Sequence, residues 1–552
     1  MNSIYKDYVK GRSATPQTEQ AKPEQVKNSA GGYVFKVDEA TAIDRFLILG
    51  SDKPTYYASA QTLTRDNAKA VVAYAQGAQT GPDLVERIVE ISTEGRAPKN
   101  SPALLALAIA ASVGNDVTQR RAFGALSKVA RTSTHLFEFV DYLDSMRGWG
   151  RAPRRAVAEW YTSKTADSLA YQAVKYRQRN GWTHRDVLRL AHPAALSPEQ
   201  DNVLHWITKG ISDTDPISLP QVIQGYEAAK GCVNGGEAAR LISEYNLPWE
   251  ALPDVVINTP QVWKALVPTM GMTALMRNAS RVARLPVTRE KSQIEEAMAA
   301  RLRDPETVRK GRLHPVNILT AMRTYASGRS QTDGSGSTWV PNRHVTDALD
   351  AAFYASFQYQ EPTGKRYLVA LDVSGSMGAE VKPGLSARDV SAAMAMSLLA
   401  TEPGVDVVGF TAANTQARYG QRRYSQGYDP YEAAMTSLDL SPRRRLDDNV
   451  AAVRGLPFGR TDCSLPARWA REQGRDYDAI VIFTDNETWA GRTEHPFQAL
   501  QKYRKVVGHK VAQIVVGLTA TDFTIADPTD PHSVDVAGFD SALPSLVAEF
   551  TK

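Results

Sequence analysis

The sequence predicts a chain that is mainly α-helical, followed by an α/β domain near the C-terminus. From about residue 66 to residue 327, apolar residues recur every three or four positions, which is the spacing of one helix face. After residue 361, short runs of β-branched and apolar residues alternate with helical patterns, as in βαβ units on a parallel sheet. The segment 327–340, which is rich in Gly and Ser, predicts a flexible linker between these regions.

The composition is typical of a globular protein. Apolar residues make up 43% of the 552 positions and charged residues 23%, enough for several domains with their own cores. Two cysteines, Cys232 and Cys463, cannot build a disulfide framework and suit a reducing cytosol. The N-terminus lacks the apolar core of a secretory signal, and the apolar run Ala103–Ala111 is too short to span a bilayer. We therefore expect a cytoplasmic protein that does not bind membranes.

The first elements along the chain are a polar lead and a long series of helices. Residues 1–26 are polar and contain Pro16 and Pro23, so we expect them to be disordered. Helices of about ten to fifteen residues, separated by breaks such as Gly81-Pro82, then fill a first domain over 27–360. The pattern fits a solenoid of HEAT-type repeats and an irregular helical bundle equally well, because no strict period is visible.

The second domain, over 361–552, is predicted to be a doubly wound, Rossmann-like α/β domain. Its expected strands are Lys365–Asp372, Val405–Phe410, Ala479–Asp485 and Val511–Leu518, and its expected helices include Ala387–Leu399 and Ser541–Phe550. The strands are short and almost wholly apolar, as expected of strands that are buried on both faces. In such open sheets, ligands bind beyond the carboxyl ends of the strands.

Candidate metal ligands lie at the ends of two of these strands, in the loop after the first of them, and on one further loop that could face the same edge. They are Asp372, Ser374, Ser376, Thr461 and Asp485. Oxygen ligands with few carboxylates suit a hard divalent cation, most naturally Mg²⁺, with Mn²⁺ or Ca²⁺ as alternatives. The competing interpretation is a degenerate site that holds no metal. Two carboxylates are too few for two-metal nuclease chemistry, and Ser374 lacks the flanking pattern of a hydrolase nucleophile.

A basic cluster lies in the middle of the helical region. Its members are Lys175, Arg177, Arg179, Arg189 and His192. The window 147–189 holds seven more basic than acidic residues, which indicates a local anionic partner. We expect Asn180-Gly181 to end one helix and Thr183 to cap the next, with Lys175 and Arg179 on one face of the first helix and Arg189 and His192 on one face of the second.

These donors can clamp a phosphate backbone, although a run of basic residues is often only a solvated helix face. His184 has no visible partner in the sequence, so we expect it at the surface.

Several stretches of the sequence are specific enough to suggest a family. They are NSAGGYVFKV (Asn28–Val37), RFLILGSDKPTYYAS (Arg45–Ser59), VKYRQRNGWTHRDVLRLAHP (Val174–Pro193), LPWEALP (Leu247–Pro253), VWKALVPTMGMTALMRN (Val262–Asn278), LDVSGSM (Leu371–Met377) and RTDCSLP (Arg460–Pro466). They resemble the Ro ribonucleoprotein family of TROVE-domain proteins, almost from end to end. The five candidate metal ligands resemble the metal-ion-dependent adhesion site of von Willebrand A domains.

The resemblance implies a bacterial or phage member, monomeric and without catalytic activity. It implies a ring of helical repeats that a von Willebrand A domain helps to close. A Y-like small noncoding RNA would bind the outer surface at Lys175, Arg179 and His192, with Arg177 as a neighbour. Single-stranded ends of misfolded RNA would enter a positive central hole. The implied role is quality control or processing of noncoding RNA, with a 3′-exoribonuclease as the protein partner.

One position departs from the family pattern, and one alternative function stays open. Many members carry Gly-Gly-Thr where this chain has Gly459-Arg460-Thr461. The arginine adds a cation beside the expected metal, which would weaken metal binding or help to recruit an acidic partner. The alternative function is a metal-dependent interaction module that captures an acidic partner, with RNA binding secondary.

Overall fold

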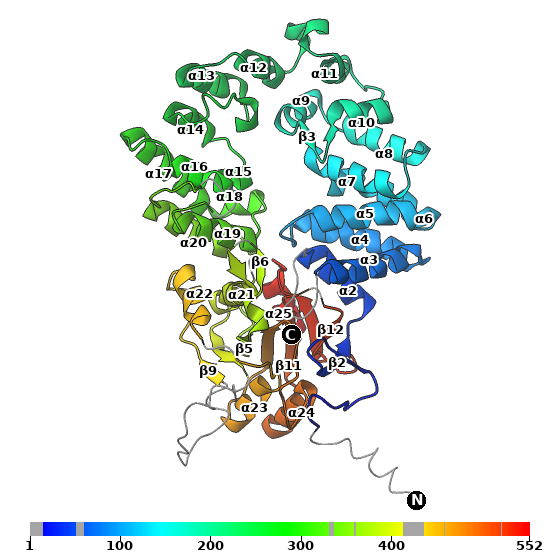
Figure 1. Ribbon diagram of the computed structural model, residues 1–552, viewed down its shortest axis with the longest axis vertical. Coiled ribbons are helices and arrows are strands. Elements are labelled where there is room, and N and C mark those ends of the chain that lie inside the picture. Colours follow the sequence, from blue (N-terminus) through cyan, green and yellow to red (C-terminus); the bar gives the residue numbers. More distant parts are fainter. Residues whose placement is uncertain are drawn as a thin grey trace, which may run out of the picture. The chain divides into compact units, whose positions relative to one another are not determined.

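Figure 1 shows the computed structural model of the protein. It describes residues 15–50, 60–330, 336–357, 360–382, 384–411, 435–456, 459–519 and 521–552. The chain divides into two compact units, which we call the helical unit and the sheet unit. The helical unit contains Val71–Gly95 and Lys99–Ser356, and the sheet unit contains Met1–Ala70, Arg96–Pro98 and Phe357–Lys552.

The helical unit begins within helix α3 (Ala60–Gln76). Its further helices are α4 (Thr80–Glu94), α5 (Ser101–Val113), α6 (Asp116–Val129), α7 (Ser133–Met146), α8 (Arg151–Thr162), α9 (Ala166–Lys175), α10 (His184–Ala191), α11 (Pro198–Lys209), α12 (Gln221–Ala229), α13 (Gly235–Tyr245), α14 (Pro260–Leu266), α15 (Met272–Arg277), α16 (Ala279–Ala283), α17 (Arg289–Arg303), α18 (Pro305–Lys310), α19 (Pro315–Ala326) and α20 (Arg343–Ala355). A short hairpin of β3 (Gln178–Arg179) and β4 (Trp182–Thr183) interrupts the series between α9 and α10.

Most helices of this unit pack on helices that lie one to three places away in the series. Helix α4 contacts α5 and α6, α5 contacts α7, and α6 contacts α8. The same holds later, where α12 contacts α13 and α13 contacts α14. Buried side chains join helices that are close in the series: the indole N–H of Trp160, in α8, donates to the carbonyl oxygen of Ala130, at the end of α6, at 2.5 Å. Packing between near neighbours is what defines a solenoid, so the repeat interpretation is confirmed over the irregular bundle.

The sheet unit contains the α/β domain. Its strands are β1 (Gln25–Lys27), β2 (Tyr33–Lys36), β5 (Arg366–Asp372), β6 (Glu380–Lys382), β7 (Leu385–Ser386), β8 (Gly404–Phe410), β9 (Met435–Ser437), β10 (Ala479–Thr484), β11 (Ala512–Gly517), β12 (Phe523–Thr524) and β13 (Ser533–Ala537). Its helices are α2 (Glu39–Leu49), α21 (Ala387–Thr401), α22 (Leu446–Arg454), α23 (Leu465–Glu472), α24 (Pro496–Val507) and α25 (Leu543–Phe550).

The main sheet has six strands in the order β13-β11-β10-β5-β8-β9. Its neighbours pair in parallel except β8 and β9, which pair antiparallel at one edge. The four predicted strands are all present in it. The predicted fold class, helical repeats followed by a doubly wound α/β domain, is confirmed. The sequence did not reveal β9 and β13, which are the two edge strands.

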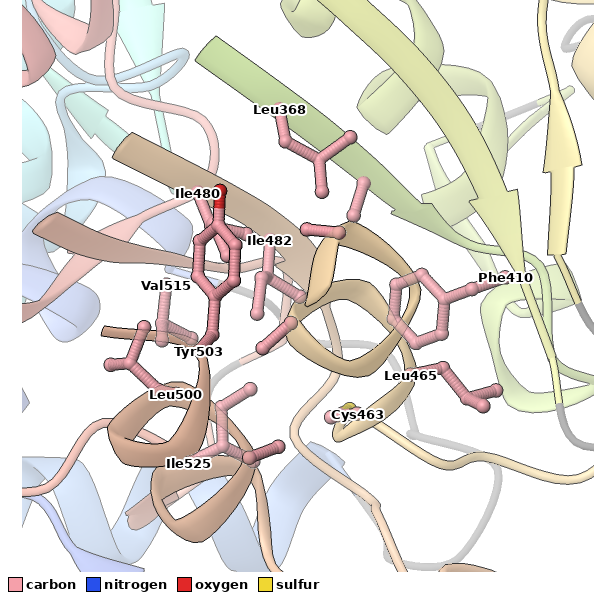
Figure 2. Close-up of a cluster of buried hydrophobic side chains, with 14 of the residues drawn as sticks. Leu368, Phe410, Cys463, Leu465, Ile480, Ile482, Leu500, Tyr503, Val515 and Ile525 are labelled. Atoms are coloured by element: carbon pink, nitrogen blue, oxygen red, sulfur yellow. The ribbon is translucent and has the colours of Figure 1, made fainter. Parts of the chain in front are cut away.

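Alternate residues of each central strand face opposite sides of this sheet. Leu368, Ile480 and Ile482 point to the side that α23 and α24 cover, where they meet Leu500 and Tyr503 (Figure 2). Helix α21 packs against β5. Burial on both faces explains why these strands read as continuous apolar runs rather than as alternating ones.

The N-terminal segment, residues 15–50, belongs to the sheet unit. Strand β2 pairs antiparallel with β12, and Val34 of β2 belongs to the same hydrophobic core as Ile480 and Leu500. Gln17 is fully buried. The expectation of a disordered lead over 1–26 is therefore wrong for residues 15–26, because their backbone and side chains bond to the α/β domain; residues 1–14 lie outside the described part of the chain. Residues 27–50 were expected to belong to the helical domain 27–360, and the compact units place them in the sheet unit.

The predicted linker 327–340 has ordered ends in the residues that the structure describes. Arg329 forms a bridge with Thr338, and the indole N–H of Trp339 donates to the carbonyl oxygen of Tyr325 at 2.8 Å. Residues 331–335 lie outside the described ranges. The bonded ends correct the expectation of a wholly flexible segment. Over the described ranges, no helix has both the length and the apolarity needed to cross a membrane.

Candidate functional site

The predicted metal ligands lie at the carboxyl end of the sheet. Asp372 is the last residue of β5, and Asp485 follows β10, its parallel neighbour. The hydroxyl of Thr484 donates to Oδ2 of Asp372 at 2.8 Å and so joins the two strand ends. Both carboxylates are buried.

Two serine hydroxyls lie beside these carboxylates. The backbone N–H of Ser374 donates to Oδ1 of Asp372 at 2.9 Å, which folds the loop back over the strand end. The hydroxyl oxygens of Ser374 and Ser376 are 3.1 Å apart, and Ser376 also bonds to Asp485. The DxSxS spacing therefore gathers one carboxylate and two hydroxyls in a single turn.

Thr461 reaches the same edge from another loop. The N–H of Gly375 donates to the carbonyl oxygen of Gly459 at 3.3 Å, and the N–H of Ala490 donates to the carbonyl oxygen of Thr461 at 2.9 Å. These bonds hold the Thr461 loop between the loops that follow β5 and β10. The structure thus brings all five predicted ligands to one end of the sheet, and each of them is buried.

The electrostatics of this donor set fit a hard cation. Burial raises the pKa of Asp372, and the nearby Asp485 carboxylate raises it further. Burial also raises the pKa of Asp485. A divalent cation would offset both effects, because it favours the charged carboxylates. In the described part of the chain, His, Cys, Asp and Glu side chains form no metal-holding group of three or more, so hydroxyl oxygens would have to complete the coordination.

Two arginines lie near this end of the sheet. Arg388 is buried and donates to the carbonyl oxygens of Val373 and Ser374 at 2.6 and 3.1 Å. Arg460, the residue that departs from the family pattern, places its guanidinium 5.1 Å from the ring centroid of Trp489. This cation–π contact gives the arginine a partner inside the protein.

The N-terminal segment supplies supporting residues that the sequence did not reveal. Nε2 of Gln17 donates to Oδ1 of Asp462 at 2.7 Å, and its Oε1 accepts from the hydroxyl of Thr488 at 2.7 Å. Asn28 donates to the carbonyl oxygen of Thr488 at 2.8 Å. These bonds tie the Thr461 loop to the loop after β10. A glutamine in a polar stretch carries no local signal for such a role.

The basic cluster differs from the expectation in one respect. Helix α9 ends at Lys175, and Arg179 lies in the hairpin of β3 and β4. Asn180 and Gly181 have φ of 51° and 81°, the left-handed backbone of a two-residue hairpin turn. The prediction that Lys175 and Arg179 share one helix face is therefore wrong. The Asn-Gly pair was the signal for this hairpin.

Lys175 and Arg177 have aromatic neighbours. Nζ of Lys175 lies 5.4 Å from the ring centroid of Tyr171 and 5.5 Å from that of Tyr176. Arg177 donates to the hydroxyl of Tyr226 at 3.2 Å and is itself exposed. Burial alone would lower the pKa of Lys175, but the surrounding tyrosines and a nearby glutamate raise it. The charge of Lys175 is therefore retained despite its partial burial.

Arg179 has an acidic partner. Its guanidinium lies 3.3 Å from Oε1 of Glu138, a buried carboxylate that also accepts from the hydroxyl of Ser101. The Arg179 side chain is still 54% exposed. It can contact a ligand while it neutralises Glu138.

Arg189 and His192 end helix α10. Thr183 caps this helix and forms the expected capping box with Asp186. His192 is the C-cap with φ of 48°, and both His192 and Arg189 are exposed. The helix dipole favours cations at this end. All five members of the basic cluster thus lie between the last residue of α9 and the C-cap of α10, in one continuous stretch of chain.

His184 was expected at the surface, and the structure buries it. Its Nδ1 lies 3.0 Å from the hydroxyl oxygen of Tyr161, and its ring packs edge-on against Phe137 at 4.9 Å. Burial lowers the pKa of His184 to about 4. Its place at the start of an exposed helix hid this, since the face that it shares with Val187 points inward.

Both the helical region and the α/β domain match models of known protein domains. The TROVE domain model matches residues 26–215 and 240–332, and the Ro60 vWA domain model matches residues 366–551. The chain is 38% identical over 543 residues to the RNA-binding protein RO60 of Deinococcus radiodurans, covering 97% of both chains. It is 34% identical to the RNA-binding protein RO60 of Caenorhabditis elegans, covering 97% of this chain and 91% of that one.

A solved structure agrees with these matches. The crystal structure of the Deinococcus radiodurans RO (RSR) protein superposes with a TM-score of 0.68 at 36% identity, covering 93% of this chain and 99% of that one. The resemblance seen in the sequence is confirmed by the domain models, the relatives and this structure together. This chain therefore belongs to the Ro60 family, in which a TROVE domain precedes a von Willebrand A-type domain.

Proposed function

We propose that this protein is a non-catalytic RNA-binding scaffold whose ligand is a Y-like small noncoding RNA. The observation that carries the proposal is the basic cluster, in which Arg177, Arg179, Arg189 and His192 are all exposed between the end of α9 and the C-cap of α10. Relatives that match nearly the whole chain are named RNA-binding proteins. Phosphate groups are the ligands that such clusters recognise in RNA.

The family resemblance supports a wider role for this scaffold. Single-stranded ends of misfolded RNA would bind in a central hole, and the bound RNAs would pass to quality control or processing. A 3′-exoribonuclease is the partner that this role requires, because a scaffold without catalytic activity needs an enzyme to degrade or trim what it holds.

Purification from the native host, followed by sequencing of the bound RNA, tests the proposal. One abundant folded small RNA is expected with the wild type and is lost from the R177A/R189A variant. With the purified RNA, each lost phosphate contact should reduce the slope of log affinity against log salt by about 0.7–0.9. Arg289 and Arg343, exposed at the starts of α17 and α20, provide the matched control variant R289A/R343A. Equal RNA recovery from all three proteins would refute the proposal.

A second candidate function is metal-dependent capture of an acidic partner by the sheet unit. Its support is the pair of buried carboxylates, Asp372 and Asp485, which repel each other and would be stabilised by a divalent cation. The cation would be Mg²⁺, Mn²⁺ or Ca²⁺, held by the two carboxylates and three hydroxyls described above, with a position left for the acidic partner.

Calorimetric titration with MnCl₂ tests the metal site. We expect one site in the wild type and at least tenfold weaker binding in Asp485→Asn. Without metal, the same variant should melt at a higher temperature, because it removes a buried charge. The control is Asp478→Asn, at the position just before the first residue of β10. This variant should bind Mn²⁺ as tightly as the wild type does. A wild type that takes up no Mn²⁺, Mg²⁺ or Ca²⁺ would show that the site is degenerate.

A further inference from the structure

The start of helix α8 carries an unusual concentration of positive charge. Arg151, Arg154 and Arg155 lie in its first five residues, and its first turn contains no acidic residue. All three are exposed. The opposite face, with Pro153 and Trp160, packs into the unit, so the arginines project from the outward side.

This arrangement is unfavourable for the helix itself. Cations at a helix N-terminus oppose the helix dipole, and Arg151 and Arg155 form a like-charged pair four residues apart. In the described part of the chain, none of the three arginines forms an ion pair, not even with Glu159 one turn further on. Charges placed at a cost to local stability, without an internal partner, indicate an external anion.

Two tryptophans lie beside this helix start. Trp149 precedes Arg151 by two residues, which places their Cα atoms within about 7 Å. Its ring centroid is 6.5 Å from that of Trp182, in the hairpin. Both tryptophans are partly exposed. Trp182 is also the direct cross-strand partner of Arg179, a member of the basic cluster.

The hairpin is bound to α7 through the carboxylates of Asp141 and Glu138. Oδ1 of Asp141, on α7, accepts from the indole N–H of Trp182 at 3.4 Å, and its Oδ2 accepts from Asn180 at 3.1 Å. Strands β3 and β4 both contact α7. These bonds fix the indole of Trp182, which lies beside the ring of Trp149, two residues before α8, and on the strand that pairs with Arg179.

We infer that Trp149, Trp182 and the three arginines of α8 form a binding site for unpaired nucleotides. We call these five residues the arginine–tryptophan patch. The arginines bind phosphates, and an unpaired base stacks on an exposed indole face. The inference rests on the proposed function and deepens it: the preferred RNA carries a bulge or a loop next to the helix that the basic cluster binds.

The tryptophans favour RNA over an acidic protein segment as the occupant. Arginines alone would bind either partner, because both are anionic. Stacking on an aromatic ring contributes about 1–3 kcal/mol per base, whereas glutamate and aspartate offer only a small carboxylate, which the negative face of an aromatic ring repels. Unpaired bases are also the part of an RNA that leaves its faces free for a protein.

Two RNA probes separate this site from the basic cluster. One is a duplex of twenty base pairs, and the other is the same duplex with a central bulge of five nucleotides that contains 2-aminopurine. The wild type should bind the bulged probe about tenfold more tightly, and the fluorescence of 2-aminopurine should fall as it stacks. R154A/R155A should reduce the salt slope for the bulged probe by about 1.4–1.8, whereas R289A/R343A should leave it unchanged.

Trp182→Ala should remove the preference for the bulge and restore the 2-aminopurine fluorescence. Since this change also removes a bond to Asp141, Trp149→Ala provides a second test that leaves the hairpin bonds in place. Equal affinities of the wild type for the two probes, or an unchanged salt slope in R154A/R155A, would overturn the inference. So would displacement of the bulged probe by poly-glutamate at equal charge concentration from the wild type but not from R154A/R155A. If the wild type bound neither probe while R177A/R189A still retained host RNA, the proposed function would fail as well.

Discussion

At the scale of single residues, His184 shows how burial sets chemistry. Its folded-state pKa of about 4 lies below the 6.5 of an exposed histidine. As pH falls through 6.5, His184 takes up a proton in the unfolded chain, whereas in the folded chain it stays neutral until about pH 4. The stability that the neutral ring provides is therefore complete above pH 6.5 and is lost as pH falls towards 4.

This linkage predicts a measurable pH dependence. Between pH 7 and pH 5, the free energy of unfolding of the wild type should fall by about 2 kcal/mol more than that of His184→Gln. Glutamine can accept from the Tyr161 hydroxyl but does not titrate. Urea unfolding at both pH values, followed by tryptophan fluorescence, makes the comparison. Equal losses in the two proteins would mean that folding does not lower the pKa of His184.

The residues that the sequence could place are those with local signals. Asp372, Ser374 and Ser376 follow a buried strand directly, and the parallel order of the strands brings Asp485 to the same edge. Gln17 could not be found in this way, because its partner Asp462 is 445 positions away. No periodicity or motif links two residues at that separation.

At the scale of elements, helix α2 is attached to the sheet by a buried ion pair. The guanidinium of Arg45 donates to both carboxylate oxygens of Asp535, at 2.6 and 3.1 Å, and to the carbonyl oxygen of Phe523. The two side chains are 0% and 4% exposed. The packing around this pair leaves no space for a side chain at position 517, since a Cβ on Gly517 would lie 2.8 Å from the Arg45 guanidinium.

Breaking this pair should be costly. Arg45→Met leaves Asp535 buried and unpaired, which should lower the free energy of unfolding of the sheet unit by about 3–5 kcal/mol. The double variant R45M/D535N should lose less than the sum of the two single variants, as urea unfolding would show. Arg444→Met, which breaks an exposed pair with Asp439, provides the control and should cost under about 1 kcal/mol. Additive losses in the double variant would show that the two residues act independently.

Element prediction succeeded where a pattern is long and failed where an element is short. The central strands β5 and β10 lie within one residue of their expected bounds, because buried parallel strands form continuous apolar runs. The hairpin of β3 and β4 has only two residues in each strand, too few for an alternating pattern. There the helical reading of the flanking residues masked the turn signal of Asn180-Gly181.

At the scale of the whole molecule, the two compact units do not follow the order of the sequence, because one unit contains both ends of the chain. Family matching and sequence patterns both begin the helical domain near residue 26, yet residues 15–50 pack into the sheet unit. Strand pairing of β2 with β12 and the contacts of Gln17 and Arg45 explain why. Sequence patterns describe what a segment can form, and the partner that it packs against is decided by contacts across the chain.

Building the sheet unit from both ends of the chain has a consequence for synthesis. Arg45 leaves the ribosome 490 residues before Asp535, its partner. At about 5–20 residues per second, the N-terminal segment waits roughly 25–100 s before its binding surface exists. Throughout that time Val34 and the edge of β2 are uncovered, and an uncovered edge can pair with another chain. The N-terminal segment is therefore open to such pairing until the C-terminal strands have been made, and slow translation would lengthen that period.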